Sequence, residues 1–256
     1  MRRVPTGILS LDEALGGGVP PGSFILLVGE VGSGPQEFVL TSSVLLAATR
    51  AGLLQVGEEQ MVPERMWWIT FGRQEQDLRE EVLSSFGQEL YGEFDRWVRF
   101  RDLGESLLSL TDPDSSLDLL DSLHRFLREE GRDSLIVLSE LTNLLSQLRG
   151  SERGWRGLLL FLRRLQRESK GWGNGLIYVP LEIGGGEEGL GELEACADGV
   201  FAFEWVRPGP YKRKRVVYLR RLRRTPSSLW GEAVFEVSFV PPMGLQLTKP
   251  ELIKGG

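Results

Sequence analysis

The feature that most constrains this chain is a short apolar segment that leads through a glycine-rich loop into a helix. Residues 24–29 are apolar without alternation, which is typical of a strand buried on both faces of a sheet. The loop at 29–34 follows, and a helical pattern covers about 36–50. Pro35 suits the first helical position, where no amide hydrogen is needed. This succession predicts an α/β fold.

Strands and helices alternate along most of the remaining chain. Further strands are expected at 66–71, 97–100, 134–138 and 176–181, and helices at 10–15, 74–86, 116–130, 141–148 and 157–168. The segments 199–206, 215–222 and 233–239 have no helices between them and predict antiparallel strands. We therefore expect a mostly parallel central sheet flanked by helices, with an antiparallel C-terminal β-hairpin edge. Residues 182–194 predict a mobile loop.

The composition is that of an ordinary globular protein, with 256 residues, a net charge of −6 and 41% hydrophobic residues. One domain is expected over 1–256, with its core at about 4–240 and a peripheral tail at 241–256. Cys196 and His124 are single, which excludes an internal disulfide and metal sites built on several cysteines or two imidazoles. No apolar run approaches the ~20 residues that cross a bilayer, and no signal peptide is evident. A cytoplasmic protein without membrane contact is expected.

The glycine-rich loop fits part of a phosphate-binding pattern, G-x-x-x-x-G-K-[ST]. In that pattern backbone amides surround the phosphates, the lysine neutralises them and the hydroxyl binds Mg²⁺. The segment here reads GEVGSGPQ, and its candidate phosphate-loop residues are Gly29, Gly32, Ser33, Gly34, Pro35 and Gln36. The glycines fit, but Pro35 and Gln36 replace the lysine and the hydroxyl. Each lost charge-assisted contact costs about 1.5–3 kcal/mol, so no cofactor is expected, and ATP with Mg²⁺ would bind weakly at best.

Together with its surroundings, this loop resembles the RecA-like ATPases of the KaiC-like family. The resemblance spans about residues 4–247, and its opening segment is the most specific part because both order and spacing agree. The matching stretches are TGILSLDEALGGGVP at 6–20, Gly22, WITF at 68–71, LIVL at 135–138, ADGV at 197–200, LRRLRRT at 219–225 and GE at 231–232. The resemblance implies a RecA-like P-loop fold in a single domain.

Two further positions of the family's chemistry are altered in this chain. The family places an acidic residue for Mg²⁺ after the strand at 134–138, where this chain has Ser139 followed by Glu140. Glu140 could substitute only if the register shifts by one residue, which would turn its side chain to the other side of the strand. Where the family carries paired glutamates that activate water, this chain has Gly72 and Arg73. We therefore predict no catalytic residue and no metal ligand.

A basic segment near the C-terminus keeps a feature of the family. No acidic residue occurs between Val206 and Gly231, and nine basic residues lie at 207–224. Arg221 and Arg223 match a basic-x-basic pair that in the family reaches the nucleotide of the neighbouring subunit, and in a strand they share one face. They are predicted to form an interface or to contact an anion. A solvated hairpin with arginines paired to surface glutamates is the alternative.

These observations favour a non-catalytic pseudo-ATPase that acts as a regulatory or scaffold subunit. Its expected partners are further copies of itself or a related active ATPase. One alternative is weak ATP binding or hydrolysis through displaced ligands, namely Arg73, Arg221, Arg223 and Glu140. Another is a nucleic-acid binder that uses the hairpin at 207–224. The net charge and the acidic pair Glu187 and Glu188 make nucleic acid the less favoured partner.

Overall fold

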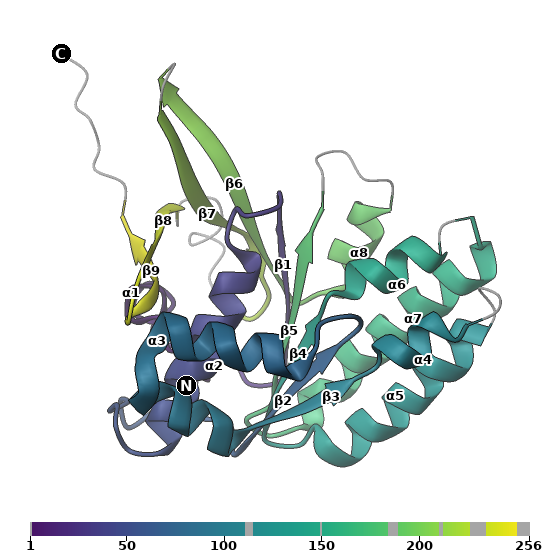
Figure 1. Cartoon of the computed structure of the whole chain (residues 1–256), viewed down its shortest axis with the longest axis horizontal. Helices are drawn as coiled ribbons and strands as arrows, with labels where there is room; N and C mark the ends of the chain where they lie inside the picture. The colour runs from purple at the N-terminus through teal and green to yellow at the C-terminus, as the bar shows by residue number, and fades with distance from the viewer. Residues whose placement is uncertain are drawn as a thin grey trace.

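Nine strands in the described part of the chain form one sheet with the order β3-β2-β4-β5-β1-β6-β7-β8-β9 (Figure 1). The computed structural model describes residues 2–110, 115–148, 150–183, 189–209, 212–225 and 234–249. The strands are β1 Ser23–Gly29, β2 Arg65–Thr70, β3 Val98–Asp102, β4 Ser134–Ser139, β5 Leu176–Glu182, β6 Gly199–Gly209, β7 Lys212–Leu222, β8 Val234–Val240 and β9 Gly244–Thr248. Strands β1–β6 pair in parallel, and β6–β9 pair antiparallel. The predicted fold class is confirmed.

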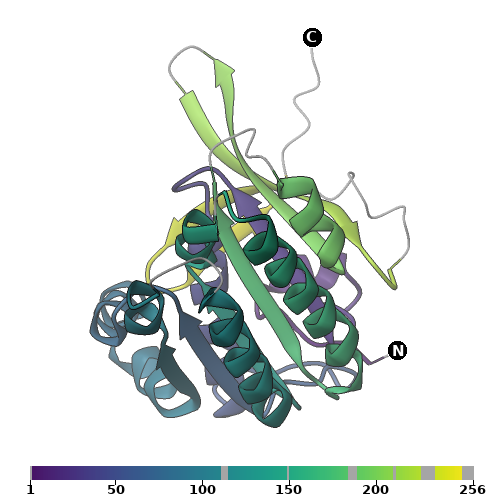
Figure 2. The same ribbon diagram turned by 90° about the vertical axis from the view of Figure 1, so that its right-hand side faces the viewer.

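Helices cover both faces of this sheet. They are α1 Leu9–Ala14, α2 Pro35–Arg50, α3 Glu75–Trp97, α4 Gly104–Leu108, α5 Ser116–Glu130, α6 Leu141–Leu148, α7 Glu152–Glu168 and α8 Leu190–Cys196, with a 3₁₀ turn, η2, at Ser169–Gly171. One buried cluster joins α1, α2 and α3 to the sheet, and a second joins α4 to α8 to its other face. Figure 2 looks onto the layer that contains α5, α7 and α8.

The central strand β1 contributes side chains to both buried clusters, one on each face of the sheet. All seven of its residues are buried. Ile25 and Leu27 pack into the α1–α3 cluster, whereas Phe24, Leu26 and Val28 pack into the opposite one. This alternation follows from the period of two in a strand, and it makes an unbroken apolar run the expected sequence for a central parallel strand.

Several elements differ from their predicted bounds. The first helix begins at Leu9 rather than residue 10. Helix α3 continues to Trp97 through a break at Gly87, whose φ of 79° lies in the left-handed region. Helix α7 begins at Glu152, because the Ser151 side chain accepts a hydrogen bond from the Gly154 amide at 3.0 Å.

Besides the turn η2, the C-terminal half holds two elements that the sequence pattern did not indicate. Helix α8 occupies part of the segment expected to be a loop, whose residues 184–188 lie outside the described part of the chain. Strand β9 lies in the segment expected to be peripheral. Its Leu245 is fully buried and donates a backbone hydrogen bond to the Thr41 Oγ1 atom of α2 at 2.9 Å. The sheet therefore extends beyond residue 240.

Candidate functional site

The glycine-rich loop lies at the carboxyl end of β1, between that strand and α2 (Figure 1). Gly29 has no space for a side chain, since a Cβ atom there would lie 2.7 Å from the Phe203 carbonyl oxygen and 2.8 Å from the Phe203 Cβ. Gly32 and Gly34 have φ angles of 72° and 128°, which favour glycine. The predicted glycines are therefore required by local crowding and by backbone geometry.

The two altered positions form the start of α2. Pro35 is buried at the first helical position and offers neither an amide hydrogen nor a cation. Gln36 and Glu37 are half-buried in the first turn. The Glu37 carboxylate binds the Arg215 guanidinium of β7 at 3.0 Å. The helix N-terminus is thus supplied with a carboxylate from its own first turn, which is favourable to the helix dipole.

An internal carboxylate contacts the loop from β5. Glu182 is the last residue of β5 and lies beside Gly29 in the parallel register. Its Oε1 atom accepts a hydrogen bond from the Gly32 amide at 3.3 Å. Burial raises the pKa of Glu182, and the charge of Glu37 raises it further, while the Gly32 amide opposes both. A protein anion therefore uses one of the amides that a phosphate loop would offer to a phosphate.

The β6–β7 hairpin also contacts the loop. The Trp205 Nε1 atom donates to the Val31 carbonyl oxygen at 3.4 Å. The Arg213 guanidinium stacks on the Trp205 ring, with 4.4 Å between its carbon and the ring centroid. With the Arg215–Glu37 pair, these contacts connect the hairpin to Val31 within the loop and to the first turn of α2.

At the second altered position, Ser139 ends β4 and is buried opposite Thr70 of β2. Strand β4 ends at Ser139, so Glu140 lies just beyond the strand. Glu140 follows the strand with a φ of 57°, and its Oε2 atom accepts a hydrogen bond from the Thr70 hydroxyl at 3.0 Å. The Thr70 oxygen in turn accepts the Arg73 amide at 2.9 Å. The Glu140 side chain is thus hydrogen-bonded to Thr70 at the end of β2.

At the third altered position, the charged groups after β2 are paired with one another. The Arg73 guanidinium forms an ion pair with Glu81 of α3. Glu75 lies in the first turn of α3 and binds Arg79 at 2.5 Å. Gly72 provides no side chain, and a Cβ atom there would lie 2.4 Å from the Asn143 amide nitrogen. None of these contacts presents a carboxylate as a general base.

The predicted pair Arg221 and Arg223 lies near the start of β1, at the opposite end of that strand from the glycine loop. Arg221 donates to the carbonyl oxygens of Glu194 and Ala197, the latter at 2.9 Å, where α8 ends. The Arg223 Nη1 atom lies 4.0 Å from the Oδ1 atom of Asp198. Asp198 is buried and also accepts the Phe24 amide of β1 at 2.9 Å. The two arginines therefore do not reach the loop of their own chain.

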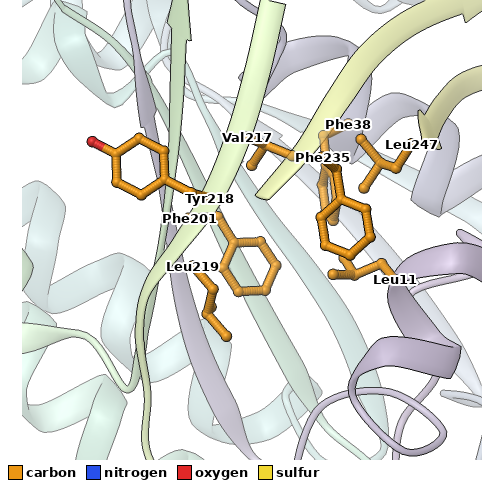
Figure 3. A pocket seen from close by; sticks show the side chains of 8 residues that line it. All are labelled: Leu11, Phe38, Phe201, Val217, Tyr218, Leu219, Phe235 and Leu247. Carbon is orange, nitrogen blue, oxygen red and sulfur yellow. The ribbon is translucent and has the colours of Figure 1, made fainter. Parts of the chain in front are cut away.

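A small apolar gap lies between α1, α2 and the C-terminal strands (Figure 3). Its lining residues are Leu11, Phe38, Phe201, Val217, Tyr218, Leu219, Phe235 and Leu247. The Tyr218 hydroxyl points away from the other seven side chains in this view, and it donates a hydrogen bond to Glu204. The gap thus belongs to the packing of the core.

The remaining candidates have structural partners. The His124 Nε2 atom lies 3.1 Å from the Glu168 carboxylate, which ties α5 to α7. Cys196 is buried, and burial raises the pKa of its thiol. Among the described residues, no group of three or more His, Cys, Asp or Glu side chains could hold a metal ion. No helix in the described segments is long and apolar enough to span a membrane.

Sequence reasoning missed Glu182 and Trp205 as contacts of the loop. Glu182 is separated from Gly32 by 150 positions, and Trp205 from Val31 by 174. Their proximity depends on which strands flank β1. A polar residue at the end of an otherwise apolar strand was the only available signal for Glu182.

Comparison with known proteins gives one long and one partial sequence match. A UPF0273 protein of Methanocaldococcus jannaschii is 27% identical over 250 residues, covering 91% of this chain and 96% of that protein. The DNA repair protein RadA of Listeria monocytogenes is 32% identical over 90 residues, which is 35% of this chain and 17% of that protein. No family model matches the chain.

A solved structure shows the same fold. A KaiC-like protein of Pyrococcus horikoshii superimposes with a TM-score of 0.70 and 21% identity, over 97% of this chain and 99% of the other.

Proposed function

We propose that this chain is a non-catalytic member of the KaiC/RecA-like P-loop ATPase family, which its relatives and its fold support, and that it acts as a regulatory or scaffold subunit. It would work by self-assembly or by pairing with an active relative. The observation that carries this proposal is the state of the phosphate loop: Pro35 replaces its cation, and the Glu182 carboxylate accepts a hydrogen bond from the Gly32 amide.

Electrostatics at the loop support this proposal. A triphosphate needs free amides and a compensating cation. Here Glu182 and Glu37 place two carboxylates beside the loop, and Arg215 is already paired with Glu37. Phosphate oxygens would have to displace Glu182 and approach a like charge, which adds a cost to the missing lysine and hydroxyl contacts.

The ends of β2 and β4 give a second line of support. Ser139 stands where the resemblance expects the metal-binding carboxylate, and Glu140 accepts a hydrogen bond from Thr70. Arg73 is paired with Glu81. The displaced-ligand alternative would require Arg73 and Glu140 to leave these partners, so it is the weaker hypothesis.

Calorimetric titration with Mg-ATP and a phosphate-release assay test the missing chemistry. Loss of two or three charge-assisted contacts at about 1.5–3 kcal/mol each implies roughly 10³-fold or greater weakening. We expect no phosphate release and no binding tighter than roughly 10 μM, which corresponds to about −7 kcal/mol. Tighter binding, or turnover that is lost when Gly32 is replaced, would contradict the proposal.

A gain-of-binding variant sharpens this test. Pro35→Lys, Gln36→Thr and Glu182→Ala together restore a cation and a hydroxyl and free the Gly32 amide. We expect the triple variant to bind Mg-ATP at least ~10-fold more tightly than wild type, since one recovered contact is equivalent to about that factor. The matched control replaces the same three residues by alanine, which removes Glu182 without restoring a ligand. Equal affinities for the two variants would show that the missing side chains are not what limits binding.

A further inference from the structure

Helix α7 carries a row of arginines along its solvent-exposed side. The residues at this surface, here called the arginine stripe, are Arg153, Arg156, Leu160, Arg163, Arg164 and Arg167, and all are exposed. Apart from the adjacent Arg163 and Arg164, they follow one another at three or four residues, so they share one helix face. At 1.5 Å per residue the stripe is about 21 Å long. Leu160 lies at its centre with 57% of its surface exposed.

The opposite side of α7 holds the helix in the molecule. Leu158, Leu162 and Leu165 are buried in the core beneath it. The helix lies in the layer with α5 and α8 that faces the viewer in Figure 2. The stripe is therefore an outward surface on a rigid element.

The stripe is only partly neutralised within the chain. Helix α7 contains five arginines and two glutamates. Glu152 binds Arg156 at 2.6 Å, and Glu168 contacts His124. Arg164 and Arg167 have no ion pair within the described segments. Like charges three or four residues apart destabilise a helix, and an acidic partner would remove that cost.

Helix α3 offers the complementary surface. It contains seven acidic residues and two arginines, and one of these, Arg79, is paired with both Glu75 and Asp95. Its outer side, here called the acidic face, consists of Asp77, Glu80, Leu83 and Ser84, all exposed. These positions share one helix face, and 40% of the surface of Leu83 is exposed. Each helix thus presents one exposed leucine, among arginines on α7 and beside carboxylates on α3.

The two surfaces cannot meet within one molecule. Helix α3 packs on the face of the sheet covered by α1 and α2, whereas α7 packs on the other face. Figure 1 places α3 and α7 on opposite sides of the molecule. A contact between them must join two copies through different patches, which is a head-to-tail arrangement.

We propose that the arginine stripe of one copy docks onto the acidic face of α3 of a second copy. This inference rests on the assembly in the proposed function and names the surfaces involved. Leu160 and Leu83 form the apolar centre, while Arg164 and Arg167 pair with Asp77 and Glu80. The exposed leucine favours a protein partner over a nucleic-acid backbone, whose contacts are made by charged and polar groups.

Sedimentation velocity at low and high salt tests this interface. Wild type is expected to exceed the 28.7 kDa of one chain in about 50 mM salt, and to dissociate in about 500 mM salt, because exposed charges are then screened. The double variant Arg164→Glu/Arg167→Glu is expected to be monomeric, and so is Asp77→Arg/Glu80→Arg. A 1:1 mixture of the two double variants is expected to assemble, because each reversed face then meets a complementary one.

A matched control is Arg125→Glu/Arg132→Glu, which makes the same charge change at exposed positions outside both surfaces. It should assemble like wild type, and circular dichroism of every variant should show an unchanged fold. A monomeric wild type, assembly of both double variants, or a mixture that stays monomeric would overturn the proposal. So would a wild type that is monomeric but binds DNA through Arg164 and Arg167. None of these results depends on nucleotide. If this interface proved wrong, the proposed loss of nucleotide binding would still be tested separately by the Mg-ATP titration and the phosphate-release assay.

Discussion

Asp12 is a buried carboxylate in the N-terminal segment whose protonation makes the stability of the fold depend on pH. Its two oxygens accept hydrogen bonds from the Thr6 amide at 2.7 Å, the Thr6 hydroxyl at 2.8 Å and the Gly7 amide at 3.0 Å. Burial nevertheless raises the pKa of Asp12 from 3.8 to about 6, because loss of hydration outweighs these three donors.

The raised pKa of Asp12 gives a stability prediction with a defined sign. Between pH 4 and 6 the native state binds a proton that the unfolded state has lost, so the free energy of unfolding falls as pH rises through this window. The contribution amounts to at most ~3 kcal/mol. Urea denaturation at several pH values should show a shallower fall for Asp12→Asn than for wild type, whatever the overall stability of the variant. Identical slopes would contradict the assigned pKa.

Asp198 gives a second prediction at the residue scale. It accepts the Phe24 amide and the Gln166 side chain, at 2.9 Å and 2.6 Å, and it pairs with Lys170. Asp198→Ala should lower the free energy of unfolding by roughly 3–5 kcal/mol, because buried donors and a partly buried cation lose their partner.

Arg223→Ala is the control for Asp198. The Arg223 side chain is 47% exposed and 4.0 Å from Asp198, so its loss should cost less than about 1 kcal/mol. Chemical denaturation measures both values. Similar losses for the two variants would show that Asp198 is stabilised mainly by the exposed arginine.

At the scale of elements, the sequence predicted what local periodicity controls. The bounds of α5 and α6 agree with their apolar spacing, and β1 and β4 agree with their continuous apolar runs. Helix α3 was expected to end near Gly87, but burial of Phe94 favours its continuation past the break. Helix α8 overlaps a glycine- and glutamate-rich segment, and β9 follows the two prolines at 241–242, so local composition favoured a loop and a peripheral tail instead.

The β6–β7 hairpin carries a prediction at this scale. Trp205→Ala removes the Val31 contact and the surface on which Arg213 stacks, while the Arg215–Glu37 pair is retained. We expect faster amide hydrogen exchange in the glycine loop and little change in β2, because local opening becomes easier there. Trp205→Phe keeps the aromatic face without the hydrogen-bond donor, so its exchange rate in the loop should lie between those of wild type and Trp205→Ala. Unchanged exchange in the loop would mean that the hairpin does not restrain it.

At the scale of the whole molecule, the candidate site depends on strand order more than on sequence pattern. The loop and its glycines were predictable from the spacing of the motif. The Glu182 contact was not, because it requires β5 to lie beside β1 in one register. The same sheet separates the arginine stripe from the acidic face and sets the loop and Arg223 at opposite ends of β1. Local sequence thus specifies the parts, and the sheet determines which parts can meet.

The crowding at Gly29 has a consequence for how such motifs are interpreted. A methyl group there would collide with the backbone of β6 whether or not anything is bound. The neighbouring strand is by itself enough to require glycine here, and the Ser33 Oγ atom of the loop would lie closer still, at 2.3 Å. A chain that binds no nucleotide can keep this glycine because the fold requires it. A motif search that relies on the glycines therefore identifies the fold and not the activity.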